Sequence, residues 1–346
     1  MIRTLSGKSD FFGLDLGTTF ARAVELKGSG PIKDLYKYGS AAFEGTIAIS
    51  EAKADQSKVM AVISQMLKDS GISTKNVAVN LASNRVFTTV IDLDKLPENE
   101  LAKTIKFQAD SYIPTPLAES KIDWAVIGDS PKDPKKIEVL LSSIANSYIE
   151  SRLEMLESIG LNIIAFEPDA MAMARALVAP DSNSAQLIID IGNAATDIVI
   201  TVGSVPHLSR VIQSGQQALI TAASQSLGID QVQARQFVFK FGLGKDKLEG
   251  QIYNSILSIV EGLAVEIDKT IKFFQGRYPT LKIERLIVTG GASILPEFPI
   301  YLANKFGINV EIGSAWRNIN IPPSQQNDVD SVSNNFAVAA GLAERN

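Results

Sequence analysis

The chain has no cysteine and only one histidine, which excludes several kinds of site. Without cysteine there are no disulfides and no thiolate metal sites, and one histidine cannot build a multi-histidine zinc site. Catalysis by a serine, histidine and aspartate triad would depend on His207 alone. Because His207 directly follows Val205-Pro206, we interpret it as a loop or edge residue and assign it no role.

The chain also lacks a long apolar run and a marked excess of one charge. No stretch approaches the ~18 apolar residues of a membrane-spanning helix, and the opening MIRTLSGKSD lacks the apolar stretch of a signal peptide. We therefore expect a cytoplasmic protein. With 33 basic and 38 acidic residues, the net charge of −5 offers no bulk attraction to nucleic acid or anionic lipid. The 346 residues, 45% of them hydrophobic, suffice for two or more domains.

Strand-like and helix-like patterns are mixed along the chain, which is typical of an α/β protein. Helical spacing occurs at residues 57–69, 146–159, 169–177 and 252–274. Strand-like alternation at 76–95, 121–127 and 136–143 encloses a helix at about 97–112. We expect residues 76–160 to form a small α+β unit inserted in a larger domain. The apolar face of 252–274 favours a core helix over a partner-binding helix.

Two segments far apart in the chain share one pattern. Aligning LDLGTTFARAVEL with IDIGNAATDIVIT superposes Asp15 on Asp190 and Gly17 on Gly192, with apolar residues around each aspartate. Both segments have the pattern of a strand, a tight turn and a second strand. The sequence therefore predicts two related halves, each beginning with an acidic-tipped hairpin.

Such a hairpin tip suits a polyphosphate with a divalent cation. Glycine permits backbone angles that point several amide N–H groups into one space, and the hydroxyls of Thr18, Thr19 and Thr196 would add donors. The aspartates would repel phosphate unless a cation lies between them, so we expect Asp15 and Asp190 to hold Mg²⁺, through water. The alternative is that each Asp-x-Gly is only a turn. Two matched copies favour the binding interpretation.

A third segment, ERLIVTGGASILPEF, predicts a buried strand that ends at Thr289, Gly290 and Gly291, followed by a helix start at 293–296. The glycine pair would let the backbone approach a flat ligand such as adenine or ribose. Strand-Gly-Gly-helix turns also occur for packing reasons, so this segment alone is weak evidence.

In this order, the three motifs resemble those of the actin-like ATPase superfamily. The phosphate motifs would be 15–19 and 190–197, the adenosine motif 289–293, and the connecting helices FEPDAMAMARAL and FAVAAGLAER. Within the superfamily the chain is most similar to the PilM family of type IV pilus assembly proteins, which is similar to the division protein FtsA. Three segments carry the likeness: the polar leader with FGLDLGTTFARAVEL, NVAVNLASNRVFTTVIDLDKLPENELAKTIKFQADSYIPTPLAESKIDWAVIG, and IEVLLSSIANSYIESRLEMLESIGLNIIAFEPDAMA.

The resemblance implies an α/β, actin-like bilobed fold of duplicated ribonuclease-H-like domains with an inserted α+β 1C-type subdomain, and ATP with Mg²⁺ between the lobes. The implied divisions are a polar leader (1–10), subdomain 1A (11–75), the 1C-like insert (76–160), a return to the first lobe with a connecting helix (161–185), the second lobe, 2A and 2B (186–335), and a final connecting helix (336–346). The expected cofactor-binding residues are Gly17, Thr18, Thr19, Gly192, Asn193, Thr196, Gly215, Gly290, Gly291 and Ala292, with Asp15 and Asp190 at the metal.

The resemblance also implies a partner, the cytoplasmic N-terminal tail of PilN, bound near the 1C-like subdomain. That tail would bring the protein to the cytoplasmic face of the inner membrane, where other pilus platform proteins, and further copies of this chain, are expected as neighbours. Arg85, Phe87 and Tyr112 are candidate groove residues, with core packing as the alternative for the two aromatic rings.

Some positions depart from the family pattern. Ser214-Gly215 stands where many relatives have two glycines, and Arg235 and Val238 replace a glutamate and a lysine that relatives often present to the ribose. The second phosphate loop, which begins at Asn193, has fewer hydroxyls than the first. These departures bear on nucleotide affinity rather than on the fold.

Turnover needs a positioned water as well as a phosphate site. Glu167 is the candidate to orient that water, although an acidic residue before the proline that starts a helix explains it equally well. Apart from Arg22, which strand alternation can turn away from the ligand, neither loop contains lysine or arginine. We therefore expect ATP binding with at most weak ATPase activity.

Two other functions share this fold. An FtsA-like, filament-forming membrane-associated protein usually adds a C-terminal amphipathic helix, whereas this sequence stops at GLAERN. A small-molecule kinase needs a catalytic base and a sugar-binding lobe, and residues 76–160 contain no polar cluster of that kind. Finally, Trp316-Arg317 suggests either an exposed aromatic contact or the closure of the last strand region.

Overall fold

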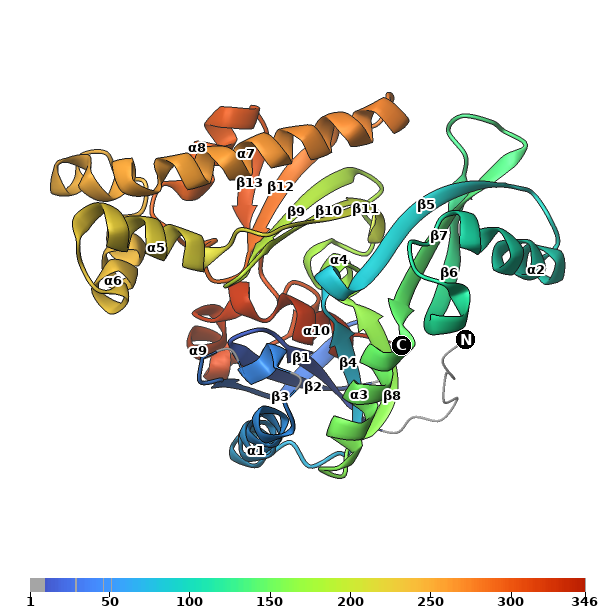
Figure 1. Ribbon diagram of the computed structural model, residues 1–346, viewed down its shortest axis with the longest axis horizontal. Helices are drawn as coiled ribbons and strands as arrows, with labels where there is room; N and C mark the ends of the chain where they lie inside the picture. Colours follow the sequence, from blue (N-terminus) through green and yellow to red (C-terminus); the bar gives the residue numbers. More distant parts are fainter. Residues whose placement is uncertain (1–9, 29, 46, 51, 346) are drawn as a thin grey trace. The chain divides into compact units, whose positions relative to one another are not determined.

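The structure is a computed structural model, and it describes residues 10–28, 30–45, 47–50 and 52–345 (Figure 1). The chain divides into two compact units. Unit 1 takes the described residues of Met1–Ala172, His207–Ser209 and Leu342–Asn346, and unit 2 takes Met173–Pro206 and Arg210–Gly341. Our prediction of a polar leader at 1–10 lies almost wholly outside the described residues.

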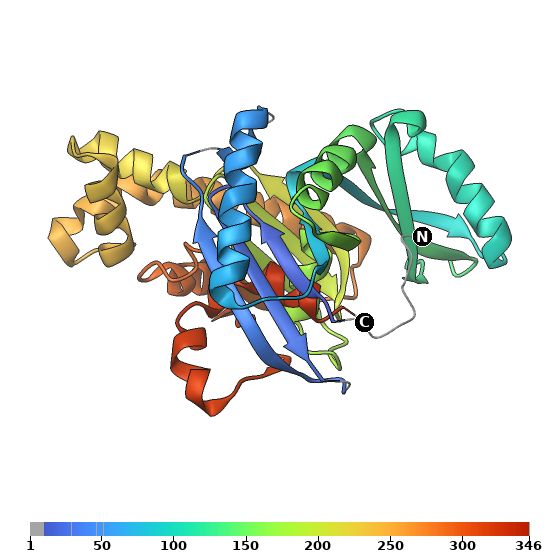
Figure 2. The same ribbon diagram turned by 90° about the horizontal axis from the view of Figure 1, so that it is seen from below.

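The main sheet of unit 1 carries the first hairpin. Its strands are β1 (Phe12–Leu16), β2 (Phe20–Lys27), β3 (Lys33–Ala42), β4 (Asn76–Leu81) and β8 (Asn162–Pro168), in the spatial order β3-β2-β1-β4-β8. The first three are antiparallel neighbours, whereas β1, β4 and β8 run parallel. Helix α1 (Lys53–Ser70) lies across the strands, as Figure 2 shows in blue, and α3 (Asn146–Glu157) packs into the same core.

A second, smaller sheet in unit 1 has a core of its own. Strands β5 (Val86–Asp94), β6 (Ser120–Asp129) and β7 (Lys136–Ala145) pair antiparallel in the order β5-β7-β6, and α2 (Glu98–Gln108) packs on one face. A strand presents every second residue on one face, and a helix presents every third or fourth residue on one face. The apolar faces of these strands and of α2 pack together. The core side chains are Ile91, Leu93, Leu101, Ile105, Ala109, Ile113, Val139 and Leu141.

Unit 2 is built on a mixed sheet in the order β11-β10-β9-β12-β13. Its strands are β9 (Ala185–Ile191), β10 (Thr196–Val202), β11 (Val205–Ile212), β12 (Ile283–Thr289) and β13 (Asn309–Ile312), with β14 (Ile319–Asn320) following. The helices of the second half are α4 (Asp169–Leu177), α5 (Gln216–Leu227), α6 (Gln231–Phe241), α7 (Gln251–Arg277), α8 (Phe298–Phe306), α9 (Gln326–Asp330) and α10 (Ala337–Ala343). His207 lies on β11, an edge strand, as its neighbours predict.

Two predictions about apolar residues are confirmed as core packing. Helix α7 buries Ile252, Ile256, Leu263, Ile267 and Ile271, so this face belongs to the interior of unit 2. Trp316 is buried, its indole N–H donates to the carbonyl of Val329 at 2.7 Å, and its ring packs on Phe336. Trp316 therefore closes the last strand region and makes no exposed contact. Along the described ranges, we find no helix with the length and apolar composition that crossing a bilayer requires.

Candidate functional site

The carboxyl ends of β1, β4 and β8 gather four polar side chains in unit 1. Because these strands are parallel, their carboxyl ends meet at one edge of the sheet, which is where α/β sheets commonly bind ligands. Asp15, Asn80, Glu167 and Asp169 are only 7%, 6%, 4% and 8% exposed. Burying so many polar groups is costly unless they are hydrogen-bonded or serve a ligand.

Asp15 is the next-to-last residue of β1 and faces a cationic neighbour. It lies opposite Arg22 across the β1–β2 pair, and its Oδ2 is 3.4 Å from Arg22 Nη1. Burial raises the pKa of the Asp15 carboxyl, and the Arg22 guanidinium only partly opposes this. Strand alternation therefore turns Arg22 toward the aspartate, and Asp15 is held at this edge in a state that favours uptake of a proton or a cation.

The tip of the first hairpin is shaped by a close backbone approach. The N–H of Gly17 donates to the carbonyl of Phe20 at 3.0 Å, and a Cβ on Gly17 would lie 3.2 Å from that oxygen. Thr18 and Thr19 are half-buried at the tip, and within the described part of the chain their hydroxyls form no hydrogen bond. Gly17 is thus needed for the turn itself, and both threonine hydroxyls point to no intramolecular partner.

Asn80 and Asp169 form a buried relay that sequence reasoning missed. The N–H of Leu16 donates to Asn80 Oδ1 at 2.8 Å, and Asn80 Nδ2 donates to Asp169 Oδ1 at 2.9 Å. The N–H of Ser83 then donates to Asp169 Oδ2 at 3.2 Å. A signal existed, because an asparagine inside the apolar strand NVAVNL is out of place unless it has a buried partner.

Glu167 is already engaged by a charged side chain. Its Oε2 accepts from Arg345 Nη1 at 2.9 Å, while Lys33 Nζ donates to the backbone oxygen of Arg345 at 3.1 Å. The carboxylate therefore has a cation beside it, which would hold it in one orientation. Its role in orienting a water stays a prediction.

The second hairpin, in unit 2, places two acids opposite each other. Asp190 is the next-to-last residue of β9 and is the cross-strand partner of Asp197 on β10. Like charges directly opposite in an antiparallel pair are destabilising, and a bound cation would relieve that repulsion. Across the described ranges no three histidine or acidic side chains gather closely enough to hold a metal unaided, so Mg²⁺ would take its remaining ligands from water and phosphate. The residues present therefore fit the ion.

The hydroxyl of Thr196 is committed elsewhere. Thr196 is fully buried, and its Oγ1 donates to the carbonyl of Ser214 at 2.7 Å. In this structure the donor stabilises the junction between β10 and the start of α5, and its expected role toward a phosphate stays a prediction. Gly192 and Asn193 also serve that junction, since their carbonyls accept from the N–H groups of Gln216 and Gln217.

Glycines let three loops of unit 2 meet at the second hairpin. A Cβ on Gly215 would lie 2.8 Å from the carbonyl oxygen of Asn193, and one on Gly290 would lie 2.6 Å from that of Ile191. A Cβ on Gly291 would run into the side chain of Gln216, whose Nε2 donates to the carbonyl of Ile191 at 3.2 Å. These glycines therefore have a packing role, whatever ligand their backbone also meets.

Asn334 holds the glycine pair in place and was not predicted. Its backbone carbonyl accepts from Gly290 N–H at 2.7 Å and from Thr289 Oγ1 at 2.8 Å, and its Nδ2 donates to the carbonyl of Gly290 at 2.9 Å. The expected helix start at 293–296 is wrong, because Ser293 Oγ donates back to the Gly290 carbonyl and the helix begins only at Phe298. Ala292 is fully buried in this turn.

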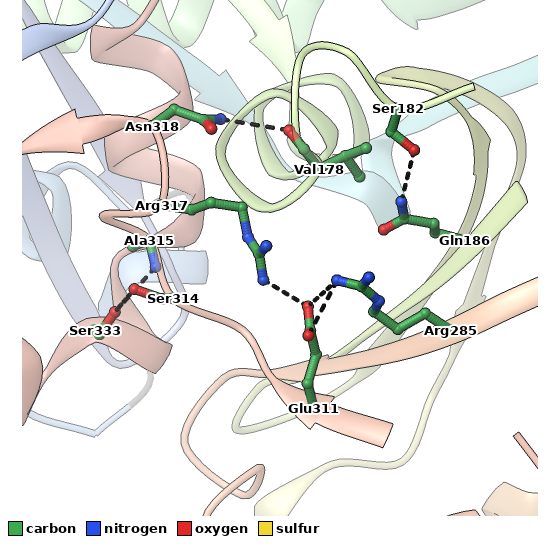
Figure 3. Close-up of polar contacts among 10 residues, drawn as sticks. All are labelled: Val178, Ser182, Gln186, Arg285, Glu311, Ser314, Ala315, Arg317, Asn318 and Ser333. Atoms are coloured by element: carbon green, nitrogen blue, oxygen red, sulfur yellow. Dashed lines mark hydrogen bonds and ion pairs between the residues drawn. The ribbon is translucent and has the colours of Figure 1, made fainter. Parts of the chain in front are cut away.

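The segment that carries Asn334 is itself fixed (Figure 3). Ser333 Oγ accepts from the N–H of Ala315 at 3.0 Å and donates to Ser314 Oγ at 2.9 Å. The loop of Ser314 follows β13, on which Glu311 accepts from Arg285 and Arg317 at 3.1 and 2.6 Å. These contacts give the glycine pair a rigid support.

Two residues that depart from the family pattern, Arg235 and Val238, lie on α6. Val238 is fully buried on α6, and the Arg235 guanidinium stacks over Phe239, 5.0 Å from the ring centroid. The side chain of Val238 is therefore interior packing.

The candidate groove residues separate into two groups. Phe87 packs against the core of the small sheet, which confirms the packing alternative for this ring. Arg85 is exposed and lies over Tyr148 of α3, 5.6 Å from the ring centroid, and Arg152 lies over the same ring at 5.2 Å. Tyr112 is also exposed. Unit 1 thus presents the guanidiniums of Arg85 and Arg152 around the Tyr148 ring. The sequence did not predict a role for Tyr148 or Arg152.

The sequence matches a family model and several solved folds. The model for the type IV pilus assembly protein PilM covers residues 13–346. A structure of a PilM-PilN type IV pilus biogenesis complex is similar with a TM-score of 0.83 and 23% identity, over 97% of this chain and 98% of that one.

Two further solved structures share the fold. The ethanolamine utilization protein EutJ from Carboxydothermus hydrogenoformans has a TM-score of 0.58 and 14% identity, covering 98% of this chain and 90% of its own. MreB5 of Spiroplasma citri bound to ADP has a TM-score of 0.55 and 14% identity, covering 96% and 95%. The mixed α/β architecture, with its related hairpins in two units, is therefore the actin-like ATPase fold expected from the sequence.

Proposed function

Because the chain belongs to the family of the type IV pilus assembly protein PilM, we propose that it is an ATP-binding adaptor of the pilus inner-membrane platform that binds the cytoplasmic N-terminal tail of PilN. The single observation that carries the nucleotide part is the repeated hairpin, in which a buried strand ends in an aspartate two residues before a turn glycine. MreB5, which shares the fold, was solved with ADP bound.

Each hairpin would contribute to binding Mg²⁺ and the phosphates. Asp15 in unit 1 and Asp190 in unit 2 are each proposed as a water-mediated Mg²⁺ ligand, and a cation beside either acid would neutralise phosphate charge there. The hydroxyls of Thr18 and Thr19 would donate to phosphate oxygens, and Gly17, whose N–H donates to the Phe20 carbonyl, would shape the turn that presents them. Gly290 and Gly291 would admit the adenosine. With Glu167 paired to Arg345, we expect at most slow hydrolysis.

Titration calorimetry of Mg·ATP into the purified protein tests this proposal. We expect binding, and we expect Asp190→Asn to weaken it about tenfold or more, because a charge-assisted hydrogen bond contributes about 1.5–3 kcal/mol. EDTA should weaken binding to wild type far more than to the variant.

Asp246→Asn is the matched control, because Asp246 is an exposed aspartate that pairs with Lys247 at 3.1 Å. Its Mg·ATP affinity should equal that of wild type. If folded wild type binds no nucleotide, the ATP part of the proposal is wrong and the protein is a peptide-binding scaffold only.

For the PilN tail we propose the surface formed by Arg85, Tyr148 and Arg152. Within the described ranges neither arginine has an acidic partner, although Arg152 Nη2 donates to the carbonyl of Ala48 at 3.4 Å. The Arg85 guanidinium and the remaining N–H groups of Arg152 can therefore bind carbonyl or carboxylate groups of an extended peptide. Arginine and tyrosine are the side chains that most often dominate binding energy at protein interfaces. Anchoring to PilN would place the protein at the cytoplasmic face of the inner membrane.

Binding of a synthetic PilN-tail peptide, followed by fluorescence anisotropy, checks this surface. We expect Arg85→Ala to weaken binding about fivefold or more, the effect of about 1 kcal/mol at an interface contact. Arg235→Ala is the control, since this arginine also stacks on an aromatic ring but lies on α6 in unit 2. Equal losses in both variants would show that the surface is misplaced.

A further inference from the structure

The Asn80–Asp169 relay connects the two sites just proposed. At one end, it holds the N–H of Leu16, the residue between Asp15 and Gly17. At the other end, it holds the N–H of Ser83, the first residue of the short 3-10 helix η2 (Ser83–Arg85) that ends in Arg85. One side therefore touches the phosphate hairpin and the other the helix that presents Arg85.

The relay can transmit a displacement from one of its ends to the other. Both bridging side chains are buried, so water cannot replace a broken hydrogen bond, and a buried group left unsatisfied costs about 1–3 kcal/mol. Asp169 uses one oxygen for Asn80 and the other for Ser83, so a shift on either side changes the geometry on the other. Asp169 is also the first residue of α4, which anchors the pair.

We propose that Asn80 and Asp169 are positioning residues that couple Mg·ATP at the first hairpin to peptide binding at Arg85. This inference rests on the proposed function. Binding of phosphate would fix the Asp15–Gly17 backbone, and the relay would fix η2 with it. Coupling between two sites is reciprocal, so the peptide would strengthen Mg·ATP binding by the same factor.

The test compares two substitutions at Ser83. Ser83→Pro removes both the hydroxyl and the N–H that donates to Asp169, at the first position of η2, and the preceding Ala82 already has the extended conformation (ψ 131°) that a following proline requires. Ser83→Ala keeps that N–H and removes a hydroxyl that has no hydrogen bond partner within the described ranges. PilN-tail affinity is measured with and without saturating Mg·ATP in each protein.

In wild type and in Ser83→Ala we expect Mg·ATP to strengthen peptide binding about fivefold or more, the lower range of ordinary allosteric coupling. In Ser83→Pro both ligands should still bind, and the ratio of peptide affinity with Mg·ATP to peptide affinity without it should be close to one. Equal ratios in the two variants would overturn the proposal, as would a wild-type ratio of one when both ligands bind. Failure of either ligand to bind wild type would instead overturn the proposed function.

An exchange of the two bridging side chains provides a rescue. Asn80→Asp alone places two acids face to face and should abolish the coupling. In the double variant Asn80→Asp with Asp169→Asn, the carboxylate introduced by the first change can still accept from Leu16. The amide introduced by the second change can donate to that carboxylate, while its own oxygen accepts from Ser83. All three hydrogen bonds then re-form with one direction reversed. We expect the double variant to regain most of the coupling, and a double variant as uncoupled as the single one would count against the relay.

Discussion

Gly290→Ala is expected to lower the free energy of unfolding of unit 2 by about 2–5 kcal/mol, combining the cost of a left-handed backbone with that of overpacking. Gly290 has φ +79°, and a Cβ there would crowd the Asp190 carboxylate and lie 2.6 Å from the carbonyl oxygen of Ile191. The backbone cannot move away easily, because the N–H and the carbonyl of Gly290 are both bonded to Asn334. Urea unfolding followed by circular dichroism measures the loss.

Gly262→Ala is the matched control for this substitution. Gly262 lies in the middle of α7, and a Cβ there would meet no atom within 4 Å. Alanine should therefore raise the free energy of unfolding by about 0.5–1 kcal/mol, the ordinary gain for replacing a helical glycine. If both variants lost stability equally, the close packing of the three loops would not be the cause.

Asp15→Asn is expected to have opposite effects on binding and on stability. Mg·ATP affinity should fall about tenfold or more, because a neutral amide cannot hold a cation as a carboxylate does. At pH 7 the folded protein should nevertheless be more stable than wild type, by an amount on the order of 1 kcal/mol for each unit by which burial raises the pKa of Asp15.

The pH dependence of this effect has a definite sign. Because the pKa of Asp15 is raised in the folded state from its ordinary value of 3.8, the native protein binds this proton more tightly than the unfolded chain does. Its contribution to stability is present below pH 3.8 and is lost as the pH rises through the native pKa. The stability difference between Asp15→Asn and wild type should therefore be near zero in acid. It should grow as the pH rises and reach a plateau above the native pKa of Asp15.

Unfolding measured in urea at several pH values checks this prediction, with Asp246→Asn as the control. The pKa of exposed Asp246 is lowered by its hydrogen bond to Lys247, so that substitution should give a small difference of the opposite sign. A difference for Asp15→Asn that does not change with pH would show that the buried carboxylate is not its source.

Local sequence patterns predicted the elements of the fold because they depend on neighbours in the chain. The helical apolar spacing of α7 and the continuous apolar run of β9 and β10 are of this kind. The resemblance to known motifs then supplied the fold class. Where a prediction depended on a single local signal, as at Ser293, other hydrogen bonds overrode it: the Ser293 hydroxyl donates to the carbonyl of Gly290 and accepts from Asn334 Nδ2, 41 residues away.

The hydrogen-bond partners of the site could not be predicted from the sequence in the same way. Asn80 binds Leu16, 64 residues away, only because β1 and β4 are parallel neighbours, and Asn334 binds Gly290 from 44 residues away. The Thr196 hydroxyl donates to the carbonyl of Ser214, 18 residues away, a partner that no local pattern indicates. Arg22 lies beside Asp15 because the β1–β2 register makes them cross-strand partners. The geometry of the turn sets that register, and the sequence alone does not specify this geometry.

The two apolar cores of unit 1 have a consequence for its local unfolding. The small sheet with α2 and the main sheet with α1 bury separate sets of side chains, with no residue in common. Each set can open to solvent as its own cooperative unit, since exchange protection of backbone amides follows contiguous packed clusters. Amides of α2 would then exchange with deuterium without exposing the strand that carries Asp15, so the small sheet and α2 can open while the phosphate hairpin and α3, which carries Tyr148, stay packed.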